Sequence, residues 1–168
     1  SALKRQGCAF LDSGNARKAA EHLEEYLGAV SQGADRRRYL DKTFSETRRE
    51  EVDACCVLGR AYLALGDVVN SSESLKRALA LTHESGDRQG EVKCLEAFGG
   101  LYRMLRIGQR AMEHHERALA ICVELEDKAG EARCLGSLGM LNFEKGETQA
   151  SRKCLEEALA LCKQNAQG

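Results

Sequence analysis

The sequence reads Gly-Arg-Ala-Tyr-Leu-Ala-Leu-Gly-Asp at residues 59–67, and Ala-Leu-Ala-Leu follows at residues 78–81. The same register returns forty residues later at Gly99 and again at Gly139, without a gap. Self-similarity at a period between about 20 and 50 residues is the signature of stacked structural repeats. The chain is therefore predicted to be an array of similar units.

Each unit reads as two amphipathic helices joined by a tight turn. Between residues 92 and 105, and again between residues 111 and 122, apolar side chains recur at helical spacing. A glycine before a short polar residue, as in Gly66-Asp67, predicts a helix stop followed by a helix start. A further copy starts near Gly7, and 12 additional residues separate it from the next copy.

The Leu-Gly-x-x-Tyr stretch at 58–62, with Gly66 and Ala78, resembles the signature of tetratricopeptide repeats. The Phe-Gly-x-x-Tyr stretch at 98–102 matches this signature again. The resemblance implies an all-α fold, a right-handed superhelical stack of about four helix-turn-helix repeats, which is an α-solenoid. We expect one array over 1–168, with repeats near 1–32, 45–85, 88–125 and 128–165 and an inserted helix extension near 33–50.

The 40-residue period and the Gly-Asp-basic-x-Gly-Glu joints resemble a subgroup with longer helices, found in Pins-like adaptors of G-protein signalling and spindle orientation. Such adaptors hold extended peptides along an inner groove by means of asparagines and arginines. Arg133 stands in a similar Gly-Glu-Ala-Arg context, but Arg60, Gly100 and Met140 occupy the positions of the asparagines.

The geometry of the family places the first helix of each pair on the concave side of the stack. The inward positions are then Lys4, Cys8 and Leu11; Asp53, Cys56, Arg60 and Leu63; Lys93, Glu96, Gly100 and Arg103; and Arg133, Gly136, Met140 and Phe143.

This predicted groove holds five basic and two acidic residues on a chain whose net charge is −1. Such a groove favours a peptide with acidic side chains between hydrophobic anchors. The alternative is an ordinary solvated helix face, because 30% of the chain is charged. A clamp for a chaperone's C-terminal carboxylate fits less well, because Cys8 and Ala97 stand where asparagine and arginine are needed.

The composition of the chain argues against several classes of protein. The chain has 168 residues, no proline and no apolar run near the roughly 20 residues that span a bilayer. We expect a soluble part of a longer protein, without membrane insertion, nucleic-acid binding, metal or cofactor. The eight cysteines include no C-x-x-C pair, and some recur with the repeat, as Cys94 and Cys134 do. Reduced structural thiols in the cytoplasm are therefore favoured over a disulfide framework.

Two further features have a functional and a structural interpretation. Basic and acidic residues alternate through 33–50, which indicates a solvated helix extension more than a docking face or nucleic-acid patch. His114 and His115 are adjacent and cannot both face one metal from a helix, so packed imidazoles are favoured over ligands.

The sequence contains no phosphate loop, nucleophile elbow or zinc-binding helix motif. We therefore expect a non-catalytic protein-interaction module that acts as an adaptor or scaffold in a larger protein. The alternative is a structural segment that forms homo-oligomers through its uncapped repeat ends.

Overall fold

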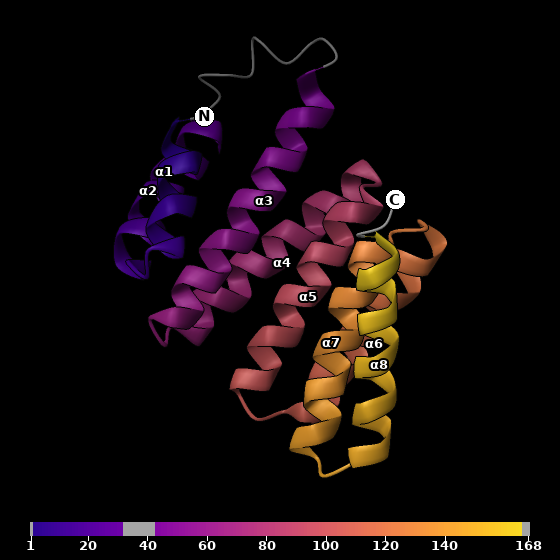
Figure 1. Ribbon diagram of the computed structural model, residues 1–168. Coiled ribbons are helices and arrows are strands. Elements are labelled where there is room, and N and C mark those ends of the chain that lie inside the picture. Colours follow the sequence, from indigo (N-terminus) through magenta and orange to yellow (C-terminus); the bar gives the residue numbers. More distant parts are fainter. Residues whose placement is uncertain (1, 32–42, 166–168) are drawn as a thin grey trace. The chain divides into compact units, whose positions relative to one another are not determined.

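The computed structural model describes residues 2–31 and 43–165, with the backbone alone for residues 43–47. These ranges form eight helices and no strand (Figure 1). The predicted all-α repeat stack is thereby confirmed. Residues 33–42 of the predicted insertion lie outside the described ranges, and a helix already runs from Thr43 onward.

The chain divides into two compact units, residues 1–90 and 91–168. The first unit contains α1 (Ala2–Asp12), α2 (Ala16–Ser31), α3 (Thr43–Ala64) and α4 (Val68–Ser85). The second contains α6 (Gly108–Glu124), α7 (Lys128–Glu144) and α8 (Thr148–Asn165), together with α5 (Arg88–Met104) from Glu91 onward. The single array and the right-handed superhelix remain predictions.

A glycine in the first helix of each pair lets the second helix approach closely. A Cβ atom on Gly7 would lie 2.6 Å from Leu23, and one on Gly59 or Gly139 would lie 2.8 Å from a leucine. In all these pairs the contact lies sixteen residues after the glycine. The repeated glycines therefore mark the points where the two helices of a pair cross.

The turns follow from backbone conformation. Gly14, Gly66 and Gly146 have φ angles of 81°, 79° and 82°, a left-handed region that side chains with a Cβ disfavour. The equivalent turn between α5 and α6 places Arg106 there, at 60°, without a glycine. Between α6 and α7 the left-handed residue is Glu126, at 56°.

The joint between repeats is built from an aspartate and a glycine. Asp127 caps α7 by accepting a hydrogen bond from the backbone N–H of Gly130 at 2.9 Å, and Asp87 does the same for Gly90 at 3.1 Å. A Cβ on Gly130 would overlap Asp127 and the Cys122 thiol, so these glycines allow consecutive helices to meet.

The core of the second unit lies between α5, α6 and α7. Its fully or nearly buried members are Val92, Leu95, Ala118, Ile121, Cys122 and Cys134. The eight cysteines are free thiols, of which five are buried. None of the described helices combines the length and the hydrophobicity that crossing a membrane requires.

Candidate functional site

In the first unit, the predicted groove residues of α1 and α3 are joined by an ion pair. The Lys4 ammonium lies 3.4 Å from the Asp53 carboxylate. Leu11 and Leu63 are half-buried, whereas Arg60 is exposed and has no ion pair within the described ranges. Arg60 is thus the basic groove residue of this unit whose charge remains available to a partner.

In the second unit, two ion pairs connect α5 to α7. Arg133 Nε lies 3.2 Å from Glu96 Oε1, and both Arg103 Nε and Nη2 lie 2.8 Å from Glu144 Oε1. The first pair joins the middle of α5 to the first half of α7, and the second joins the last turns of both helices. The two helices therefore run side by side in the same direction.

These pairs change the electrostatics expected for the groove. Lys4, Arg103 and Arg133 each have a carboxylate partner, so the charges of these three groove bases are locally neutralised. Glu144 is not among the residues that the sequence predicts for the groove, because its link to Arg103 joins residues 41 positions apart and depends on side-chain direction. Lys93 is exposed on α5.

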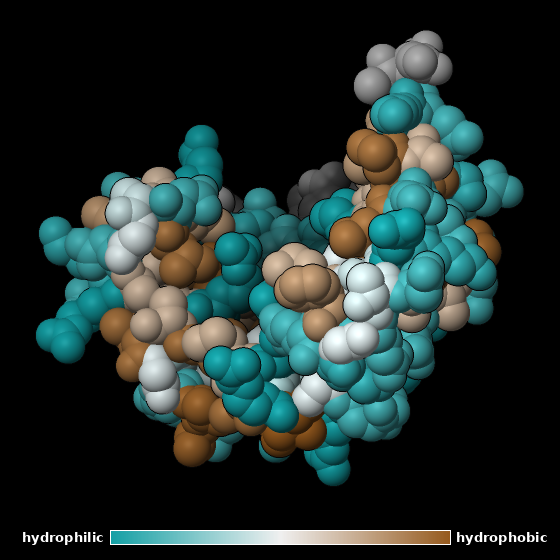
Figure 2. Space-filling model, turned by 60° about the horizontal axis from the view of Figure 1, so that its bottom comes forward, coloured by the Kyte–Doolittle hydropathy of each residue, from teal (hydrophilic) through white to brown (hydrophobic). Residues whose placement is uncertain are grey.

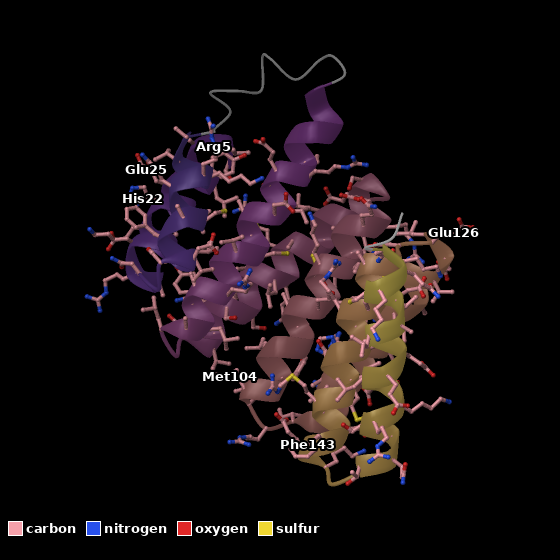
Figure 3. All side chains as sticks on the ribbon, viewed as in Figure 1. Arg5, His22, Glu25, Met104, Glu126 and Phe143 are labelled. Carbon is pink, nitrogen blue, oxygen red and sulfur yellow. The ribbon has the colours of Figure 1, made fainter. Side chains whose placement is uncertain are left out.

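Apolar side chains gather where α5 and α7 end. Phe143 is 70% exposed, Met104 65% and Met140 48%, although all are large and apolar. Met140 and Phe143 belong to the predicted groove, and Met104 is an addition from the structure. Figure 3 shows Met104 and Phe143 at the same end of the second unit.

The adjacent histidines have separate surroundings. The His114 ring stacks on Tyr102 at 5.2 Å and on Phe98 at 5.4 Å between centroids. His115 is buried against Gly99, and a Cβ atom on Gly99 would overlap the His115 ring. Within the described ranges, no group of three His, Cys, Asp or Glu side chains could hold a metal.

Stacked helical hairpins with glycine crossings, acid-capped joints and a largely polar surface define a helical-repeat protein. Residues 54–89 and residues 105–164 each match the tetratricopeptide repeat family. The chain therefore contains tetratricopeptide repeats, which generally mediate protein–protein interaction. This fold is typically non-catalytic.

Solved structures show the same fold. MamA is 22% identical, with a TM-score of 0.64, over 99% of this chain and 80% of that chain. BtubC (BKLC) from P. vanneervenii is 20% identical, with a TM-score of 0.75, over 98% of this chain. The match covers 63% of the BtubC chain, less than two thirds of its length. No curated protein sequence matched the chain.

Proposed function

We propose that this chain is a non-catalytic adaptor or scaffold module that holds a segment of a partner protein on the first helices of its repeats. The observation that carries the proposal is the placement of exposed Arg60, Met140 and Phe143 on α3 and α7, which are first helices of repeats. Side chains exposed on a rigid helix surface can recognise a partner without being needed for the fold.

The proposed groove consists of the residues expected from the sequence: Lys4, Leu11, Asp53, Arg60, Leu63, Lys93, Glu96, Arg103, Arg133, Met140 and Phe143. The partner is an extended peptide, as in Pins-like adaptors, with hydrophobic side chains and an acidic one opposite Arg60. A cytoplasmic location fits the free thiols.

The test is affinity capture of a cytosolic partner by the wild-type chain, followed by binding measurements with the recovered protein. Arg60→Glu should weaken binding about tenfold or more, because it replaces an attraction by a repulsion. Far-ultraviolet circular dichroism should be unchanged, because Arg60 is exposed and lies outside any ion pair that the described residues form.

Arg103 and Arg133 need paired variants, because reversal of either charge alone also breaks an ion pair. The double variants Arg103→Glu/Glu144→Arg and Arg133→Glu/Glu96→Arg keep the pairs and reverse their direction. Binding that falls in these folded variants shows direct contact with the partner. Undiminished binding by Arg60→Glu and both double variants would refute the charged part of the groove.

A second candidate function is self-association through α8. Leu155 and Leu159 of this helix are 44% and 55% exposed, whereas the equivalent residues of α6 are better covered: His115 is 5% exposed and Leu119 is partly buried. An uncovered apolar helix face tends to pack against another surface. Light scattering over a concentration series tests this function, and a monomer at all concentrations excludes it.

A further inference from the structure

The two ion pairs of the second unit enclose a stretch of surface that carries no charge of its own. Glu96 with Arg133 lies at one end and Arg103 with Glu144 at the other. Gly100 of α5 and Gly136 of α7 fall between these pairs in sequence. A Cβ atom built on either glycine meets nothing within 4 Å, so open space lies above both.

Large apolar side chains border this space toward the turns. We call Gly100, Met104, Gly136, Met140 and Phe143 together the α5–α7 apolar surface. Figure 2 looks toward the end of the second unit with the α5–α6 and α7–α8 turns, and apolar side chains lie there among hydrophilic ones. Methionine adapts its shape to an incoming side chain, and phenylalanine offers a flat ring.

We propose that the α5–α7 apolar surface binds a large uncharged apolar side chain of a partner peptide, which inserts above Gly100 and Gly136 against Phe143 and the two methionines. The inference rests on the proposed function and names the anchor that this unit selects. An acidic anchor is disfavoured, because Arg103 and Arg133 already have carboxylate partners within 3.2 Å. A new carboxylate would have to displace one of them to gain a comparable interaction.

The size of the surface selects a peptide over a second copy of the chain. A stable protein–protein interface buries about 800 Å² on each partner, or about 20 to 30 residues a side. Three large side chains and two glycines supply a small part of that area. One inserted side chain, with its flanking backbone, matches the space that is present.

The experiment selects peptides from a random-peptide phage library on the full chain and measures the affinity of the recovered peptides. The chain contains no tryptophan, so a peptide with tryptophan at its anchor position reports binding without any tryptophan emission from the chain itself. We expect peptides with one constant large apolar position. The emission of the tryptophan should shift to the blue on binding, because its ring leaves water.

Substitutions in the α5–α7 apolar surface test whether peptide binding depends on it. Phe143→Ser should weaken binding at least about tenfold, and Met104→Ser/Met140→Ser/Phe143→Ser should remove it. Aspartate at the anchor position of the peptide should also remove binding. The matched control is Val123→Ser on α6, which is 54% exposed in the same unit and should bind as the wild type does. Circular dichroism checks that each variant is folded.

The outcomes separate the two proposals. Peptides that bind the folded triple variant as well as the wild type, yet fail on Arg60→Glu, overturn the apolar anchor and leave the proposed function standing. Failure to recover any peptide that binds the chain would overturn both. A lower molar mass in light scattering for Phe143→Ser than for the wild type would also overturn the proposal, because it assigns the surface to a second copy.

Discussion

His115 takes the place that leucine holds in the other three helix pairs. The residues opposite the repeated glycines are Leu23, Leu75, His115 and Leu155. The His115 ring is buried, and its Nδ1 atom has no hydrogen-bond partner within the described ranges. A buried polar atom without a partner costs about 1 to 3 kcal/mol. The imidazole is therefore a weak point in an otherwise apolar row.

His115→Leu should raise the free energy of unfolding by about 1 to 2 kcal/mol at pH 7.5, because it removes the unsatisfied nitrogen. Chemical denaturation of the wild type and the variant measures the difference. The matched control is Leu75→His, which creates the same arrangement against Gly59 and should destabilise the chain. Equal stability of His115→Leu and the wild type would contradict the prediction.

The same substitution should change the pH dependence. Burial, followed by the charges of His114 and Arg103, lowers the pKa of His115 from 6.5 to about 4. The unfolded chain then binds a proton that the folded chain refuses, so stability falls as the pH drops from 6.5 to 4 and then levels off. The loss from His115 is about 2 to 3 kcal/mol. In the His115→Leu variant this loss should disappear. Of the loss of stability due to the two histidines, only the smaller contribution of His114 should remain, because burial lowers the pKa of that residue too.

Arg106 and Glu126 hold left-handed conformations that glycine holds elsewhere. Their φ angles of 60° and 56° resemble that of Gly86, at 65°. Arg106→Gly and Glu126→Gly should each stabilise the chain by about 0.5 to 1 kcal/mol, since the relief of strain exceeds the added freedom of the unfolded chain. Urea midpoints measure the gain. Gly146→Ala should move the midpoint the other way, and a shift of the same sign would refute the argument.

At the scale of helices, a buried glutamate recurs every forty residues in the first helix of a pair and, in two of the pairs, meets a base from the second helix. Glu51 pairs with Arg77 at 2.7 Å, and Glu91 pairs with Arg117 at 3.6 Å. In the last pair the equivalent base is absent, because Glu157 occupies its place. Glu131 instead pairs with Lys128 of its own helix, at 2.7 Å.

Glu157→Arg should therefore restore the pairing between α7 and α8. We expect a gain of about 0.5 kcal/mol, because the new base is partly exposed and the change also removes the weak pair of Glu157 with Lys153, at 4.0 Å. Thermal unfolding at low and high salt measures it, and added salt should reduce the gain. The reverse change, Arg77→Glu, should destabilise α3 against α4. A stabilising Arg77→Glu would contradict this account of the repeat.

The helices themselves could be predicted from the sequence, whereas their side-chain pairs could not. Apolar spacing and the Gly66-Asp67 type of turn depend on neighbours along the chain, so they can be read locally. The pairs of Arg103 with Glu144 and Arg133 with Glu96 join residues 41 and 37 positions apart. Their formation depends on how α5 and α7 lie together. For this reason the sequence predicts a more basic groove than the structure shows, because the ion pairs neutralise some of the basic side chains.

At the scale of the whole molecule, the exposure of cysteines at equivalent repeat positions shows whether a following helix covers them. Cys122 of α6 is fully buried, whereas Cys162, forty residues later on α8, is exposed. Burial also raises the pKa of the Cys122 and Cys134 thiols, and that of Cys55 to about 12. Since the thiolate is the reactive form, these three thiols are protected both by limited access and by a raised pKa.

The native chain should therefore react with a thiol reagent at pH 8 in three stages. Cys162 should react at once, half-buried Cys8 and Cys154 more slowly, and the other five only when the helices open. Cys162→Ser should abolish the first stage alone. In guanidinium all eight thiols should react without a reductant, and fewer would reveal a disulfide. Rapid reaction of more than three thiols in the native chain would mean that the repeats are open, because covering by the next helix is what separates Cys122 from Cys162.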